Sequence, residues 1–218
     1  VFNYAHLPTL FKPQRRIDES HLPTPDQKLE ILQRTNQQLS EAGYLYIGMD
    51  HFALPDDELA VAQREGTLYR NFQGYSTHRD CDLIGIGVTS IGVVGNTYSQ
   101  NLKTTEEYYA SIDGGDLSVF RGVELDADDI LRRDVITELI CNFRLKFSDI
   151  EQRNDIVFSD YFATELEELK VMVEDGLVTM DEESVTVATA GRLLIRNVCM
   201  VFDRYLREKS EQRFSKVI

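Results

Sequence analysis

The stretch TPDQKLEILQRTNQQLSEAGYLYIGM, from Thr24 to Met49, places a helix directly before a strand. Its first four residues have the form of a capping box with proline at the first helical position. Leucines then recur along one helical face until Gly43, which is typical of a helix end. YLYIGM, at 44–49, is a short apolar run of the kind found in strands covered on both faces. This order predicts an α/β fold.

The neighbouring sequence continues the alternation of helix and strand. Pro55, followed by three acidic residues, predicts a helix that ends near Gly66, and LIGIGV at 83–88 predicts another buried strand. FNYA at 2–5 is interpreted as a strand cut into by the start of the sequence. We therefore predict parallel strands with right-handed crossovers, as in part of a barrel. So small a parallel sheet is incomplete, and we expect the other strands to come from sequence before Val1.

From about residue 104 the pattern is mainly helical. In order, it predicts a helix capped at Thr104, a long amphipathic helix from Asp126, a helix from Phe158 to Gly176, a hairpin of 177–180 with 184–188, and a long final helix from Thr189. Helix, hairpin, helix is a winged-helix-like outline. We divide the chain into an α/β part at 1–103 and a helical domain with a small β-hairpin at 104–218.

Charge and composition exclude several classes of protein. The chain has 218 residues with 23 basic and 37 acidic side chains, a net charge of −14, which argues against a nucleic-acid partner. The halves divided at Lys103 carry 9 basic against 12 acidic and 14 against 25, so the first half is less hostile to an anionic ligand. No apolar window is long enough for a membrane span. The three cysteines lack C-x-x-C spacing and indicate a reducing compartment, so we expect a cytoplasmic protein.

Candidate site residues follow the predicted strands, because ligands of parallel α/β folds bind beyond the strands' carboxyl ends. The segments there are 5–6, 49–52 and 90–92. Asp50 with His51 is a candidate acid/base pair, although adjacent side chains on an extended segment point opposite ways and an aspartate there often only caps a helix. Gln73, in a polar and aromatic cluster, suits polar recognition of a nucleotide or amino acid, or equally the backbone of its own loop.

Glycines and arginines are also candidate ligand contacts, and each type has two interpretations. Glycines at 85, 87, 92 and 95 lie within the predicted strand and after it, not at a turn into a helix, so they lack a dinucleotide fingerprint and favour close approach of a ligand to the backbone. Four arginines of the less acidic half are candidates for pairing with substrate carboxylates or are simply solvated: Arg15, Arg16, Arg70 and Arg79.

Six sequence blocks carry a family resemblance. They are FNYAHLP (2–8), YIGMDHFALPDDELAVAQREG (46–66), RNFQGYST (70–77), YSQN (98–101), VITELICNFRL (135–145) and GRLLIRNVCMVFDRYL (191–206). In this order they resemble the C-terminal half of the bacterial oxygen-independent coproporphyrinogen III oxidases, a family of radical S-adenosylmethionine enzymes. The resemblance implies the last βα units of an open (β/α) barrel followed by the family's helical C-terminal domain.

The resemblance also implies the chemistry of the longer protein. Members of the family decarboxylate two propionates of coproporphyrinogen III oxidatively to vinyl groups and produce protoporphyrinogen IX for haem synthesis. They use a [4Fe-4S] cluster and S-adenosylmethionine, and an electron-donor partner such as a flavodoxin or a ferredoxin is implied but not identified. By position, Ala5, Gln73 and Ile91 resemble the family's contacts to S-adenosylmethionine. The neighbours of Ile91, in Thr89-Ser90-Ile91-Gly92, differ from the expected Ser-Ala-Ile-Ser run.

One departure from the family limits what this sequence does alone. The C-x-x-x-C-x-x-C-x-C segment that holds the cluster is absent, and the three cysteines match none of its ligands. We therefore expect this chain by itself to be inactive and to hold no metal, and its incomplete sheet to pair with a second copy. Two other functions stay open: a haem chaperone, disfavoured because those relatives carry a Tyr-Trp pair and this chain has no tryptophan, and a helical module that binds a protein partner.

Overall fold

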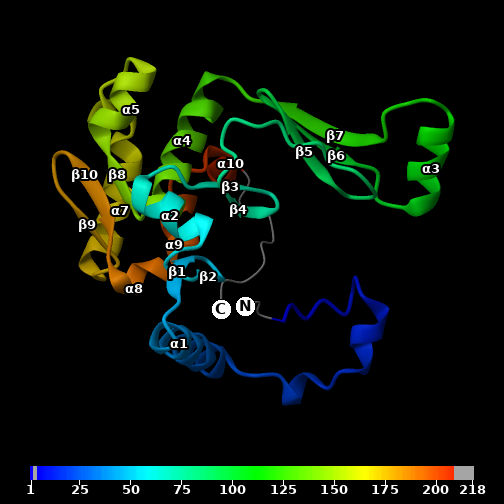
Figure 1. The fold of residues 1–218 in the computed structure, drawn as a ribbon, viewed down its shortest axis with the longest axis horizontal. Coiled ribbons are helices and arrows are strands. Elements are labelled where there is room, and N and C mark those ends of the chain that lie inside the picture. The colour runs from blue at the N-terminus through cyan, green and yellow to red at the C-terminus, as the bar shows by residue number, and fades with distance from the viewer. Residues whose placement is uncertain (2–3, 209–218) are drawn as a thin grey trace.

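The structure is a computed structural model that describes residue 1 and residues 4–208 (Figure 1). In the first part of the chain, two short 3-10 helices precede the regular elements. The elements are 3-10 turns at Lys12–Arg16 and Glu19–His21, α1 (Pro25–Glu41), β1 (Leu45–Gly48), β2 (His51–Ala53), α2 (Glu58–Glu65), β3 (Tyr69–Asn71), β4 (Gly74–Ser76), β5 (Ile91–Val94) and β6 (Thr97–Asn101).

The second part is mainly helical, as the sequence predicted. Its elements are α3 (Thr105–Asp113), β7 (Val119–Glu124), α4 (Ala127–Asn142), β8 (Arg144–Lys146), α5 (Phe147–Asn154), α6 (Phe158–Tyr161), α7 (Ala163–Glu174), β9 (Val178–Met180), β10 (Ser184–Val187), α8 (Thr189–Arg192), α9 (Ile195–Met200) and α10 (Arg204–Glu208). An α/β part followed by a helical domain with a small hairpin is thus confirmed as the fold class.

The starts of α1 and α4 lie where their capping residues predicted, whereas α2 begins at Glu58 and not at Pro55, so Pro55 and Asp56 lie before the helix and not in its first turn. Thr24 caps α1 through a reciprocal capping box with Gln27, and Asp126 caps α4 in the same way. Asp57 caps α2, two residues after Pro55, and Gly66 closes that helix in the left-handed conformation with φ 71°. Local hydrogen bonds therefore set these boundaries before any tertiary packing is considered.

The strand pairing differs from the predicted parallel arrangement. Within the described residues every paired strand is antiparallel, and the first 103 residues supply the β1–β2 and β3–β4 hairpins and the β5–β6 pair. YLYIGM does form a strand, but it turns back at Met49 and Asp50 into β2. The predicted strand at 83–88 is absent apart from a bridge between Leu83 and Val93. Of the predicted strand at 2–5, Phe2 and Asn3 lie outside the described residues, and Tyr4 and Ala5 are not in a strand.

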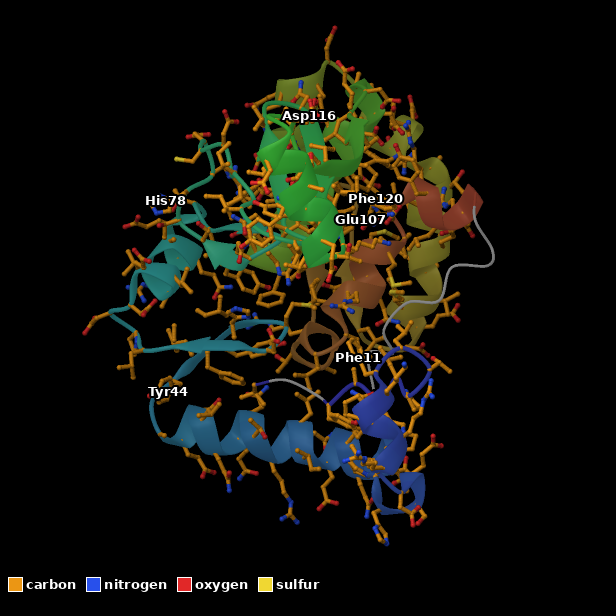
Figure 2. The ribbon with its side chains drawn as sticks, turned by 90° about the vertical axis from the view of Figure 1, so that its right-hand side faces the viewer. Phe11, Tyr44, His78, Glu107, Asp116 and Phe120 are labelled. Carbon is orange, nitrogen blue, oxygen red and sulfur yellow. The ribbon has the colours of Figure 1, made fainter. Side chains whose placement is uncertain are left out.

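Two peripheral parts extend from the body of the molecule. The antiparallel sheet β5-β6-β7 reaches outward with α3 at its far end (Figure 1). Helix α1 lies as a separate rod below the β1–β2 hairpin, with Phe11 near one end and Tyr44 near the other (Figure 2). Three of the leucines on the predicted face of α1 are only half-buried, and no residue of that helix is fully buried.

The second part of the chain holds the larger core. Phe158, Phe162 and Phe202 are fully buried there and join side chains from α4, α7, α9 and the small sheet. That sheet has three strands in the order β8-β10-β9, so the predicted hairpin is confirmed and β8 is an additional strand. The predicted final helix is wrong in its length, because it is divided into the short helices α8, α9 and α10.

Helix α4 connects the two parts. Ile140, near its end, contacts both the large core and a second cluster built on Ile47, Leu68 and Tyr75. Gln63 of α2 donates hydrogen bonds to the carbonyl oxygens of Ile47, at 2.7 Å, and of Cys141, at 2.8 Å. The hairpins of the first part are therefore fixed against α4. In the described residues no helix is both long and apolar enough to cross a bilayer.

Candidate functional site

Gln73 lies in the tight turn of the β3–β4 hairpin. Asn71 pairs with Gly74 across the hairpin, which leaves Phe72 and Gln73 as the turn. The Gln73 backbone N–H donates to Asn71 Oδ1 at 2.8 Å, while the Gln73 side chain is exposed. Gly74 has φ 132°, and a Cβ there would lie 3.1 Å from His51 Nε2. The turn thus holds the Gln73 amide on the surface, available to a ligand.

Ile91 is half-buried at the start of β5, opposite Gln100. The glycines around it allow the chain to approach itself closely. A Cβ on Gly85 would lie 2.9 Å from the carbonyl carbon of Ile91, and one on Gly92 would lie 2.9 Å from Leu83 O. Tight backbone packing therefore explains these two glycines, and this corrects the expectation that they serve ligand approach.

Ala5 belongs to the N-terminal segment, which has no regular secondary structure between residues 4 and 7. Gln14 fixes this segment from both sides: its Nε2 donates to Ala5 O at 3.1 Å, and its Oε1 accepts from Leu7 N. Ala5 is exposed. The three predicted contacts to S-adenosylmethionine thus come from three separate elements, of which the β3–β4 turn and the β5–β6 pair meet where Phe72 lies edge-on to Tyr98, with ring centroids 5.4 Å apart.

Asp50 and His51 are brought together, although adjacent strand residues normally diverge. Asp50 lies in the turn between β1 and β2, so its carboxylate Oδ1 lies 2.7 Å from His51 Nδ1. The His51 ring meets the Tyr75 ring edge-on, and its Nε2 faces Gly74 beside the Gln73 turn. Tyr75 donates to Ile140 O at 3.0 Å, and burial raises the pKa of its hydroxyl far above the usual range. The arrangement suits a histidine whose tautomer is fixed by a carboxylate.

A cavity of about 380 Å³ lies between β3, the β5–β6 pair, α4 and α10. Most of its wall is aromatic or aliphatic, including Phe72, Tyr98, Ile136, Ile140 and Phe202, and Arg70 and Arg133 also line it. A second cavity, about 390 Å³, adjoins it and shares Tyr69, Val93, Arg133 and Thr137. The wall of the second cavity is mainly charged, with acidic residues outnumbering arginines.

The four arginines that the sequence suggested as anion partners have different surroundings. Arg15 donates from Nε to Pro8 O at 2.9 Å and is exposed, as is Arg16. Arg70 and Arg79 are half-buried. Buried guanidinium nitrogens of both have no hydrogen-bond partner among residue 1 and residues 4–208: Nε of Arg70, and Nε and Nη2 of Arg79. Arg79 has Glu138 at 3.9 Å, whereas the contact of the Arg70 guanidinium among the described residues is with the Tyr75 ring, 5.5 Å from its central carbon. Two of the four are therefore unsatisfied donors.

The cysteines do not form a metal site. Cys141 and Cys199 are buried, and burial raises the pKa of the Cys141 thiol to about 12 and that of Cys199 still further above its usual value. A thiolate is the form that binds iron, so neither residue fits a cluster ligand. Cys81 is exposed. Across the part of the chain that the structure describes, no group of three or more His, Cys, Asp or Glu side chains is placed to hold a metal ion.

This chain is similar to known proteins along its whole length. The family description "HemN C-terminal domain" matches residues 125–194. The "Oxygen-independent coproporphyrinogen III oxidase" of Escherichia coli is 56% identical over 219 residues, covering 100% of this chain and 48% of that protein. The protein of the same name from Thermostichus vulcanus is 47% identical, with 100% of this chain and 67% of that protein covered.

A solved structure is similar over nearly the same extent. It is described as "Coproporphyrinogen III oxidase (HemN) from Escherichia coli is a Radical SAM enzyme", and it matches with a TM-score of 0.91 and 56% identity, covering 94% of this chain and 47% of that one. The chain spans about half the length of most of the curated relatives it matches. Because the similarity in sequence extends along the whole of this chain and the similarity in fold along 94% of it, this chain belongs to the family of the oxygen-independent coproporphyrinogen III oxidases.

Proposed function

We propose that this chain works as part of an oxygen-independent coproporphyrinogen III oxidase, which converts two propionates of coproporphyrinogen III to vinyl groups and yields protoporphyrinogen IX in haem biosynthesis. The proposal rests on the 56% identity to the Escherichia coli enzyme along the entire chain. In each conversion a hydrogen atom leaves the propionate β-carbon, the bond to the carboxylate carbon breaks, carbon dioxide departs, and one electron passes to an acceptor. Two such decarboxylations convert one molecule of coproporphyrinogen III to protoporphyrinogen IX.

The reaction needs two cofactors, and this chain fits one of them. S-adenosylmethionine, cleaved reductively at a [4Fe-4S] cluster, supplies the radical that takes the hydrogen atom. The buried thiols of Cys141 and Cys199 do not suit iron, and Cys81 alone cannot supply the several thiolates that a cluster needs, so we propose that the cluster ligands lie outside this sequence. An electron-donor protein, such as a flavodoxin or a ferredoxin, completes the set of proposed partners.

We assign S-adenosylmethionine contacts to Ala5, Gln73 and Ile91. The exposed side chain of Gln73 is presented by the two-residue turn of the β3–β4 hairpin, and an amide that both donates and accepts suits the polar groups of this cofactor. Ile91 and Ala5 offer aliphatic surface and backbone groups for adenine or ribose. The Gln73→Ala variant is expected to bind S-adenosylmethionine about tenfold more weakly, in line with the loss of one or two hydrogen bonds. Gln33→Ala, exposed on α1, is the matched control, and equal affinities of the two variants would remove Gln73 from the assignment.

The function is tested with the full-length protein, anaerobic and with its cluster reconstituted. Incubation with reductant, S-adenosylmethionine and coproporphyrinogen III is expected to release two equivalents of carbon dioxide and to form protoporphyrinogen IX. The product is oxidised to the porphyrin and measured by chromatography. A protein that cleaves S-adenosylmethionine and leaves the porphyrinogen unchanged contradicts the proposal.

Three further expectations stay with this proposal. We propose a cytoplasmic location, and self-association of the isolated chain through the unpaired edges of its small sheets. The division into 1–103 and 104–218 is also kept as a proposal, although β7 pairs with β6 across it. Analytical ultracentrifugation of the isolated chain measures its self-association.

A further inference from the structure

We propose that the cavity between β3, the β5–β6 pair and α4 binds a carboxylate-bearing side arm of the substrate through Arg70 and Arg133. This inference rests on the proposed function, since it identifies the ligand group as a propionate of the tetrapyrrole. It adds a site on this chain to the contacts assigned to S-adenosylmethionine.

The guanidinium groups of Arg70 and Arg133 are available to bind an anion. Within the described residues no hydrogen bond or ion pair involves the side chain of Arg70 or Arg133, and the Nε of Arg70 is shielded from solvent without a partner. Unpaired buried donors are rare because each forfeits about 1–3 kcal/mol of solvation. The ring of Tyr75 lies 5.5 Å from the guanidinium carbon of Arg70, a cation–π contact that leaves the hydrogen-bond donors of this arginine without an acceptor.

The other charged groups around this cavity are already paired. Arg204 lies 3.2 Å from Asp129, and the hydroxyl of Tyr205 donates to the same carboxylate at 3.0 Å. Arg132 is bound to Asp128 and Glu165, at 2.9 and 2.8 Å. Asp203 accepts from the backbone N–H of Tyr205 at 2.9 Å. The positive charge that remains for a ligand therefore belongs to Arg70 and Arg133.

The shape and polarity of the cavity restrict the anion. Its volume of about 380 Å³ is near the lower end of the ligand-pocket range, ~300–1,000 Å³, so it suits one arm and its ring better than a complete macrocycle. Aliphatic and aromatic side chains form most of the wall, among them Leu125, Ile136 and Phe72. Asp129 and Asp203 on the same wall disfavour a doubly charged phosphate more strongly than a singly charged carboxylate. A single carboxylate on an apolar stem fits all three conditions, and Arg matches a carboxylate through two parallel hydrogen bonds.

The adjoining cavity does not offer the same chemistry. Asp80, Asp82, Asp134 and Glu138 line it beside three arginines, and its Arg79 and Arg153 both approach Glu138, at 3.9 and 3.2 Å. An anion there would meet an excess of carboxylates. The apolar cavity is accordingly the site, and Arg133, which lines both cavities, borders it on the α4 side.

Two ligands of this enzyme carry a carboxylate on a short stem, the tetrapyrrole and the methionyl part of S-adenosylmethionine. The experiment separates them by measuring, on the full-length protein, the affinities for coproporphyrin III, for its tetramethyl ester and for S-adenosylmethionine. The variants are Arg70→Gln, Arg133→Gln and their lysine counterparts, which keep the charge. Arg34→Gln is the matched control, because Arg34 is exposed on α1 and pairs only with Glu30 among the described residues.

Each glutamine variant is expected to bind coproporphyrin III at least about tenfold more weakly, the loss expected for a charged hydrogen bond. The lysine variants should lose less, the ester should bind all proteins alike, and affinity for S-adenosylmethionine should change less than twofold. Melting curves identify any variant that fails to fold, in which case the lysine variant of the same position decides.

Unchanged affinity for coproporphyrin III in both glutamine variants overturns the inference, and so does a loss confined to S-adenosylmethionine. A wild-type protein that binds coproporphyrin III but does not convert coproporphyrinogen III contradicts the proposed function alone. The carboxylate site is then still judged by the affinities of the variants.

Discussion

Glu165 is expected to be the side chain whose charge contributes most to the stability of the helical domain. Its carboxylate is 2% exposed, and a single oxygen, Oε1, accepts from Arg132 of α4 at 2.8 Å and from Arg207 of α10 at 2.9 Å. Glu165→Gln keeps the shape but removes the charge, and it directs amide hydrogens or a neutral oxygen at two guanidinium groups. The variant leaves Arg132, which is 14% exposed, with one carboxylate partner instead of two.

The size of the effect follows from burial. Removing one member of a buried ion pair costs about 3–5 kcal/mol. Arg207 is 34% exposed, so solvent screens its share and we expect the lower end, about 3 kcal/mol. For a chain of this size ~1 kcal/mol shifts the melting temperature by about 2–4 °C, which predicts a decrease of ~6–12 °C.

The assay is a thermal melt followed by circular dichroism, with Glu167→Gln as control. Glu167 lies on the same helix, is 70% exposed and pairs with Lys170, so its loss should shift the melt by less than about 2 °C. The double replacement Glu165→Leu with Arg132→Met should recover much of the lost stability, because it leaves no unpaired charge from this pair. Equal shifts for Glu165→Gln and Glu167→Gln would refute the reasoning.

Three further predictions concern pH, thiols and packing. Burial opposes ionisation of Asp128, but hydrogen bonds from one tyrosine and two arginines outweigh it and hold the pKa of this carboxyl below 3.8. The stability that the ionised carboxylate contributes is complete above the pKa of the unfolded chain and is lost as the pH falls through the lower pKa of the folded protein. Acid titration should therefore destabilise the protein below about pH 4, and an Asp128→Asn variant should show a flatter profile of stability against pH. At pH 8 a thiol reagent should modify Cys81 and leave Cys141 unmodified, since burial raises the Cys141 pKa to about 12, and peptide mass spectrometry assigns the label. A Cβ on Gly191 would lie 2.0 Å from Leu177 O, so Gly191→Ala should lower the free energy of unfolding by about 2 kcal/mol or more in a denaturant titration, whereas Gly176→Ala should show only the smaller cost of its left-handed φ of 68°.

Those parts of the fold that depend on local interactions were predictable from the sequence. The capping residues Thr24 and Asp126 fix helix starts by hydrogen bonds within four residues, and the structure confirms both. The alternating runs around Asp181 likewise predicted the β9–β10 hairpin. Strand direction was not predictable in this way, because pairing depends on partners far along the chain. An apolar run such as 44–49 has the same pattern in a parallel strand and in a hairpin.

The run at 83–88 shows a second limit of periodicity. Ile84 and Ile86 are 68% and 82% exposed, although the pattern predicted a buried strand. Gly85 instead packs against the backbone of Ile91, and Asn101 Nδ2 donates to the carbonyl oxygens of Gly85 and Gly87 at 3.0 and 2.9 Å. The segment is thus held by tertiary hydrogen bonds as an irregular chain. Glycine spacing indicated close packing but not what it packs against.

The candidate site shows the same division between local and distant causes. Asp50 and His51 were recognisable as a pair by their chemistry, yet an extended segment would point their side chains apart. Their 2.7 Å contact depends on the two-residue turn after Gly48, in which Met49 adopts φ 55°. Nothing in Gly-Met-Asp-His carries the usual Asn-Gly signal of such a turn. The turn is stabilised by packing: Gly48 lies against the Tyr75 hydroxyl, so close that a Cβ would be 2.1 Å from it, and that hydroxyl is bonded to α4. A helix more than sixty residues away, fixed through Ile140 O, therefore sets the geometry of the pair. Sequence identified the chemical groups, whereas their orientation came from the packing of the first part of the chain on α4.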